Sequence, residues 1–135
     1  MNENIRSIVA FFCENAKANA MTLGARQSVK FTLQGVLIDG GEKNGLYAEK
    51  SFIDFSEISC GFSLREILLM LKSVSGMPSG TAVVFTHCRK KQEIEYALSS
   101  CGFRAYEHFS VTNVVKRLFN EDSGKEISYC LAIKK

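Results

Sequence analysis

The stretch TAVVFTHCRKKQEIEYALSSCGFRAYEHF, residues 81–109, decides the fold of this chain. Its first seven residues are almost continuously apolar, which is typical of a short strand covered on both faces of a sheet. Residues 90–101 follow with the period of a helix, Gly102 is placed to end that helix, and residues 103–109 alternate as a half-buried strand does. The apolar side of this helix is formed by Ile94, Ala97, Leu98 and Cys101. The change of period predicts that both strands lie in one sheet, with the helix on one face of it.

The rest of the chain repeats this alternation of helices and strands. The patterns predict helices over 3–19, 64–74 and 111–119, and strands over 28–38, 46–55 and 126–133. Gly35 indicates a turn or bulge, and Asp39-Gly40-Gly41 and Asn44-Gly45 are strong reversal signals, so we expect an antiparallel meander after the first helix. The order α-β-β-α-β-α-β-α-β predicts a single α/β domain over residues 1–135, with a mixed central sheet flanked by helices.

The composition is that of an ordinary globular domain. Of the 135 residues, 46% are apolar and 23% are charged, and the net charge is +3. A chain of this size and composition can bury a core without disulfides or metals. Its small net charge gives no indication of a nucleic-acid partner.

The cysteines and the N-terminal sequence indicate a reducing compartment. The five cysteines form no CxxC pair, and most lie beside apolar residues, so we expect reduced thiols. His87 and Cys88 are adjacent, but no second His/Cys pair completes a zinc site, so we expect no metal. No acidic residue is spaced to activate the Cys88 thiol through His87. No signal-peptide pattern and no run near 18 apolar residues is present, which predicts a cytoplasmic protein without a membrane span.

The junction at residues 60–63 is the strongest candidate for chemistry. A strand ends in SFIDF, the chain bends through Cys60-Gly61-Phe62-Ser63, and a strongly apolar helix begins. Free backbone N–H groups at a helix N-terminus bind phosphate well. Gly61 would let phosphate oxygens approach the backbone, and Ser63 would add a hydroxyl donor. Alternatively, Gly61 only eases the turn, and Ser63 only caps the helix in a capping box with Glu66.

This junction resembles the pyrophosphate-binding turn of the GNAT-type N-acetyltransferases. Their Q/R-x-x-G-x-G/A pattern falls on Ile58–Ser63, with Gly61 matching and Ser63 in place of the small last residue. The element order over roughly 30–135 is also similar, including a "GF" before the next strand at Gly102-Phe103. The resemblance implies an acyltransferase that uses acetyl-CoA to acylate an amine of a small molecule or protein. It implies that coenzyme A lies on Cys60, Gly61, Phe62 and Ser63, with Arg89 beside its phosphates.

The residues expected to carry the reaction are less well defined. A carboxylate base would be Glu49, Asp54 or Glu57, and the family's tyrosine acid corresponds best to Tyr96, which is out of phase by two residues. Ile58 stands where the family has Gln or Arg. These departures leave a second interpretation open, a non-catalytic interaction or regulatory domain that keeps the fold but not the chemistry and binds a protein partner.

Two further resemblances show that these sequence patterns indicate a shared architecture more than a shared chemistry. The C-terminal half is similar to the last elements of class I methyltransferases, and residues 80–106 are similar to the opening of a helicase second lobe. The nucleotide-binding motifs of both families are absent. A basic cluster is formed by Arg89, Lys90 and Lys91. It either binds a phosphate group or is only the solvated first turn of a surface helix.

Overall fold

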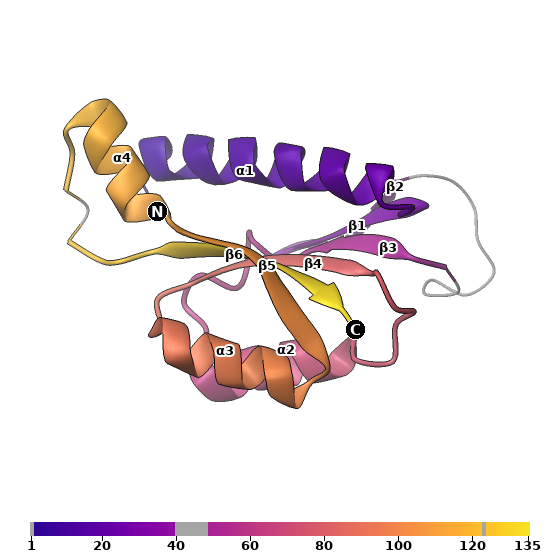
Figure 1. Cartoon of the computed structure of the whole chain (residues 1–135). Helices are drawn as coiled ribbons and strands as arrows, with labels where there is room; N and C mark the ends of the chain where they lie inside the picture. Colours follow the sequence, from indigo (N-terminus) through magenta and orange to yellow (C-terminus); the bar gives the residue numbers. More distant parts are fainter. Residues whose placement is uncertain (1, 40–48, 123) are drawn as a thin grey trace.

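The computed structural model describes residues 2–39, 49–122 and 124–135, in which six strands form one mixed sheet between two layers of helices (Figure 1). The strands are β1 Gln27–Thr32, β2 Gly35–Asp39, β3 Ser51–Asp54, β4 Ala82–His87, β5 Phe103–Ser110 and β6 Ser128–Lys134. The helices are α1 Glu3–Thr22, α2 Leu64–Ser73, α3 Lys91–Ser100 and α4 Val111–Phe119. The predicted α/β class with a mixed, helix-flanked sheet is confirmed. Within the described residues, no helix has the length and apolarity needed to cross a bilayer.

Helices α1 and α4 cover one face of the sheet (Figure 1). The Asn2 side chain caps α1 by accepting a hydrogen bond from the Ile5 backbone N–H at 2.8 Å. The helix ends before Gly24, whose φ of 106° lies in the left-handed region that glycine tolerates. Its inward stripe packs with α4 and the sheet and is made of Ile5, Ile8, Val9, Cys13, Ala16 and Ala20.

Helices α2 and α3 cover the opposite face (Figure 1). The predicted side of α3 is buried, since the exposed fractions of Ile94, Ala97 and Leu98 are 0%, 0% and 2%. Gly102 ends this helix with a φ of 80°. All six residues of β4 are buried, as expected for a strand covered on both faces. Strands β4 and β5 lie in the same sheet, and α3 packs on one face of it, as predicted.

The first half is not an antiparallel meander, and that prediction was wrong. β1 and β2 form an antiparallel hairpin, but β3 pairs with β1 in parallel, in the sheet order β2-β1-β3-β4-β6-β5. All four residues of β3 are buried, so this strand gains from a place inside the sheet instead of outside β2. The reversal signals at Gly40-Gly41 and Asn44-Gly45, and the start of the strand predicted over 46–55, lie outside the described residues.

Strand β5 does not alternate as predicted. Phe103 is buried, but the next three residues are all exposed. The register with β6 shifts between Ala105 and Glu107, which places a β-bulge at Tyr106. β5 is an edge strand of the sheet, so its side chains follow this irregularity instead of a strict period of two.

Candidate functional site

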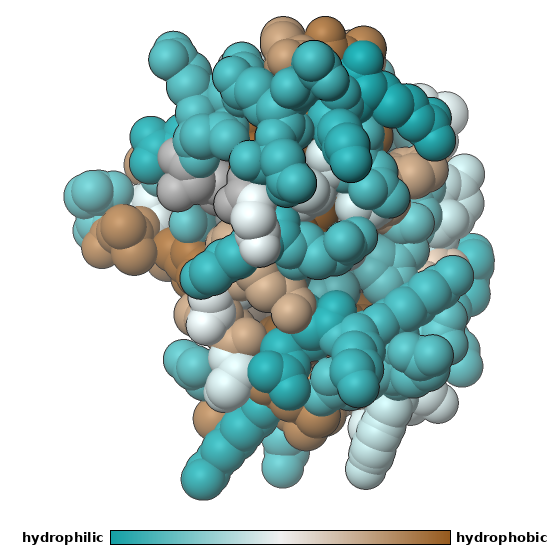
Figure 2. Space-filling view, turned by 90° about the vertical axis from the view of Figure 1, so that its left-hand side faces the viewer, coloured by the Kyte–Doolittle hydropathy of each residue, from teal (hydrophilic) through white to brown (hydrophobic). Residues whose placement is uncertain are grey.

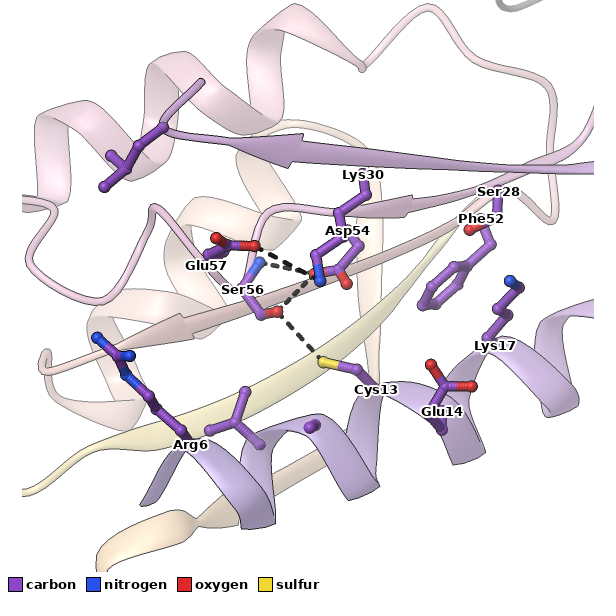
Figure 3. Close-up of a pocket in the computed structure, with 13 residues that line it drawn as sticks. Arg6, Cys13, Glu14, Lys17, Ser28, Lys30, Phe52, Asp54, Ser56 and Glu57 are labelled. Atoms are coloured by element: carbon purple, nitrogen blue, oxygen red, sulfur yellow. Dashed lines mark hydrogen bonds and ion pairs between the residues drawn. The ribbon is translucent and has the colours of Figure 1, made fainter. Parts of the chain in front are cut away.

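A pocket lies between α1 and the parallel strands β1 and β3, and it extends past their carboxyl ends (Figure 3). Its volume is about 400 Å³. In open α/β sheets, ligands bind beyond the carboxyl ends of parallel strands, and β1 and β3 are parallel neighbours. Its lining is contributed by Arg6, Val9, Ala10, Cys13, Glu14 and Lys17 of α1, by Ser28, Lys30, Leu33, Phe52 and Asp54, and by Ser56 and Glu57 after β3.

A short chain of hydrogen bonds crosses the sheet side of this pocket (Figure 3). Asp54, the last residue of β3, accepts two hydrogen bonds at Oδ1, from the Ser56 backbone N–H at 2.8 Å and from Ser56 Oγ at 2.6 Å. Cys13 Sγ of α1 donates to Ser56 Oγ at 3.2 Å. The backbone contact forms an Asx turn, which turns the chain out of the strand. Asp54, Ser56 and Cys13 are all buried, with exposed fractions of 6%, 5% and 7%.

Burial controls the ionisation of this chain of groups. It raises the pKa of Asp54 above the ordinary carboxyl value, although the hydrogen bonds from Ser56 and the charge of Lys30 act in the opposite direction. Burial, with the nearby Asp54, raises the pKa of the Cys13 thiol to about 12. Cys13 is therefore a neutral donor at physiological pH, and Asp54 is the final acceptor.

Charged side chains of both signs surround the buried carboxyl. Lys30 Nζ lies 3.5 Å from Glu57 Oε2 in a half-exposed ion pair. The α1 side of the pocket adds Arg6, Glu14 and Lys17. Phe52 contributes an apolar wall. The pocket can therefore contact a donor group, an anionic group and an apolar group of one small molecule.

A histidine pair occupies the carboxyl end of β4. His87 Nδ1 accepts a hydrogen bond from the Arg89 backbone N–H at 3.1 Å, so its proton lies on Nε2, which faces His108 Nε2 at 2.8 Å. Burial, with the neighbouring His108, lowers the pKa of His87 to about 4. Burial also lowers the pKa of His108. His108 Nδ1 is buried and has no hydrogen-bond partner among the described residues. Both rings are neutral at physiological pH.

The basic cluster at the start of α3 is neutralised in part by its own helix. The Glu93 carboxylate accepts from Arg89 Nη2 at 3.0 Å and from the Lys90 backbone N–H at 3.3 Å. This carboxylate satisfies the backbone N–H of the N-cap residue Lys90 and offsets part of the positive charge there. The end of the molecule where β4 ends and β6 begins is mostly hydrophilic, with separate small apolar patches (Figure 2).

The predicted cofactor turn has a well-defined geometry. Ser63 caps α2, and the predicted capping box is confirmed: Ser63 Oγ accepts from the Glu66 N–H at 3.2 Å, and Glu66 Oε1 accepts from the Ser63 N–H at 3.0 Å. A side chain at Gly61 would meet no atom within 4 Å. The Cys60 and Cys88 sulfurs are 4.0 Å apart, which places the turn beside the loop of Arg89. A pyrophosphate on this turn would have to share the helix N-terminus with the Glu66 carboxylate.

The predicted catalytic residues lie apart. Glu49 precedes β3, whereas Glu57 follows its far end, where it pairs with Lys30. Tyr96 lies on α3 and is 60% exposed. The structure thus brings the loops of Cys60 and Arg89 together, but it does not join Glu49, Glu57 and Tyr96 in one place.

The contact between Cys13 and Ser56 was not predicted from the sequence. One signal was available for Asp54, which is a single acidic residue within the apolar run FIDF. Such a residue in a buried strand needs a polar environment. No local pattern links Cys13 to that strand, because 43 residues separate it from Ser56.

No model of a known protein family matches the chain, and no curated protein matches it.

Proposed function

We propose that this chain is a non-catalytic regulatory domain of the cytoplasm that binds a small polar molecule around Asp54. The observation that carries the proposal is the buried Asp54 carboxyl at the end of a parallel strand. Both hydrogen bonds that Ser56 donates go to Oδ1. A ligand that donates to Oδ2 would offset the desolvation of the carboxyl.

The groups around Asp54 are suited to binding and not to nucleophilic catalysis. Cys13 has a pKa of about 12, and its thiol donates to Ser56, so it is not a thiolate. The Ser56 hydroxyl donates to Asp54 and is almost fully buried. No histidine lines the pocket among the described residues. An enzyme of this kind would need an accessible nucleophile with a base beside it.

The pocket chemistry selects the class of ligand. Asp54 favours a hydroxyl or amine donor, and Arg6 favours an anionic group on the same molecule. Phe52 favours an apolar or aromatic part. Amino acids and nucleoside monophosphates are the ligands that combine these features within a volume of about 400 Å³.

A thermal-shift screen with these two classes tests the proposal. A ligand at a hundredfold its dissociation constant should raise the unfolding free energy by about 2.7 kcal/mol. Asp54→Asn should abolish the shift, whereas Glu95→Gln, on the exposed side of α3, should preserve it. The proposal fails if no member of the panel stabilises the parent at millimolar concentration, or if the shift persists in Asp54→Asn.

A second candidate is acyl transfer from acetyl-CoA to an amine, favoured by the adjacency of the Cys60 turn and the Arg89 loop. In this candidate, the pyrophosphate lies on the turn and Arg89 contacts another phosphate of the coenzyme. Proton transfer would fall to Glu57 or to the substrate itself. Calorimetry with acetyl-CoA, and an assay for release of the coenzyme thiol with small amines and peptides, test it. Arg89→Ala should weaken binding, and an absence of binding at millimolar acetyl-CoA would exclude this candidate.

A further inference from the structure

Cys60 and Cys88 lie in contact at the carboxyl ends of two neighbouring strands. Their sulfurs are 4.0 Å apart, although 28 positions separate the residues in sequence. Cys60 lies in the loop that follows β3, and Cys88 follows β4 directly. Strands β3 and β4 are parallel neighbours, so both loops leave the same edge of the sheet.

Three buried hydrogen bonds hold the loop of Cys60 to the end of β4, which precedes Cys88. Ser59 Oγ donates to the Thr86 carbonyl at 2.8 Å and accepts from the Thr86 N–H at 2.9 Å. Thr86 Oγ1 donates to the Ser56 carbonyl at 2.9 Å. Ser59 and Thr86 are both 0% exposed. Ser59, next to Cys60, and Thr86, two residues before Cys88, are therefore held together, and the sulfurs have to approach by about 2 Å to reach disulfide length.

The two sulfurs differ in access to solvent. Cys88 is exposed and Cys60 is half-buried. Burial raises the pKa of Cys60, and it raises the pKa values of Cys13 and Cys130 to about 12. A dissolved oxidant therefore reaches Cys88 first. Cys101 is half-buried too, but its Sγ contacts the Leu68 carbonyl at 3.9 Å instead of another sulfur.

We propose that Cys60 and Cys88 form a reversible dithiol–disulfide site that responds to peroxide. The Cys88 thiolate attacks one peroxide oxygen, the O–O bond breaks, and water leaves after protonation, which leaves a sulfenic acid on Cys88. The Cys60 sulfur then attacks the Cys88 sulfur, the S–S bond forms, and the hydroxyl leaves as a second water with the Cys60 proton. Two thiols are oxidised, and one hydrogen peroxide is reduced to two waters. A dithiol reductant reverses the reaction.

The disulfide would join the turn before α2 to the start of the α3 loop. It would therefore restrict the two loops that the acetyl-CoA candidate needs. The site stands independently of ligand binding at Asp54, because neither cysteine lines that pocket among the described residues.

Peptide mass spectrometry of the folded protein tests the proposal. Reduced protein is freed of reductant, treated with equimolar hydrogen peroxide and digested without reduction. The expected product is a Cys60–Cys88 linked peptide, with a protein mass lower by two hydrogens. The thiols titrated after denaturation should fall from five to three and return to five when the protein is first treated with dithiothreitol.

Single variants distinguish this pair from general oxidation. Cys88→Ser should abolish the cross-link, and Cys60→Ser should leave a Cys88 sulfenic acid that dimedone traps. Cys101→Ser, the matched half-buried control, should keep the cross-link. Circular dichroism should confirm that each variant is folded, and the parent in denaturant should give mixed pairs. A different pair in the folded parent, or Cys88 sulfinic acid with Cys60 still free, would overturn the proposal.

Discussion

Ser56 donates twice to one oxygen of Asp54, through its hydroxyl at 2.6 Å and through its backbone N–H at 2.8 Å. A single residue therefore supplies both described hydrogen bonds of a buried carboxyl. The same hydroxyl accepts from Cys13 of α1. The Ser56 side chain thus links three features of the pocket: the loop after β3, the buried Asp54 carboxyl and the covering helix α1.

Ser56→Ala should destabilise the protein. The variant loses the hydroxyl donor to Asp54 and leaves Cys13 without its acceptor, so we expect the unfolding free energy to fall by about 1–3 kcal/mol. Urea unfolding measures this loss. Ser75→Ala, which removes an exposed contact to the Lys72 carbonyl, should change it by less than about 0.5 kcal/mol. Equal effects in both variants would show that the Asp54 contact contributes nothing specific.

Asp54→Asn should change how stability depends on pH. The folded protein holds a proton on Asp54 above the ordinary pKa of 3.8, whereas the unfolded chain releases it. The Asp54 carboxyl therefore lowers the unfolding free energy as pH rises from 3.8 through its raised pKa. We expect the variant to gain stability relative to the parent across this window. Urea unfolding at several pH values measures the difference, and a constant difference would contradict the shift.

His87 should dominate the acid sensitivity between pH 6.5 and 4. Its folded pKa is about 4 against an ordinary value of 6.5, so its contribution to stability is complete above pH 6.5 and is lost as pH falls. The loss amounts to about 3 kcal/mol. His87→Gln should flatten the pH profile in this window, and His108, whose pKa is also lowered, contributes in the same direction. The comparison is cleanest in the Asp54→Asn background, because Asp54 acts with the opposite sign.

Two residues of α3 should respond very differently to truncation. Leu98 is 2% exposed and packs on the sheet, so Leu98→Ala should cost about 2–5 kcal/mol of unfolding free energy. Tyr96 is 60% exposed, so Tyr96→Ala should change it by less than about 0.5 kcal/mol. Thermal and urea unfolding measure both. Tyr96→Phe would matter only for acyl transfer, and an effect on that rate would support the acyltransferase candidate.

Two variants in the turn before α2 should affect different quantities, one the affinity for acetyl-CoA and the other the stability of the fold. Gly61→Val should leave the unfolding free energy nearly unchanged, because a Cβ there meets no atom within 4 Å and φ is not positive. Ser63→Ala should lose about 1 kcal/mol with its cap. If acetyl-CoA binds at this turn, Gly61→Val should weaken its affinity while Ser63→Ala mainly lowers the melting temperature. Unchanged affinity in Gly61→Val would place the coenzyme elsewhere.

The sequence by itself determined the kind and position of most elements. The apolar stripe of α3, the glycine ends at Gly24 and Gly102, and the capping box of Ser63 and Glu66 all follow from interactions within a few residues. Such local preferences are present in every stretch of chain. They therefore predict helices, strands and caps without knowledge of the neighbours.

Only the tertiary structure decided which strands and side chains meet. The turn signals after β2 were compatible with a meander, but β3 lies beside β1 because a strand buried on both faces gains most inside the sheet. That choice brings Asp54 beneath Cys13 and places Cys60 beside Cys88. These contacts join residues 28 to 43 positions apart. No periodic pattern encodes such separations, because they depend on the sum of burial and hydrogen bonding over the whole fold.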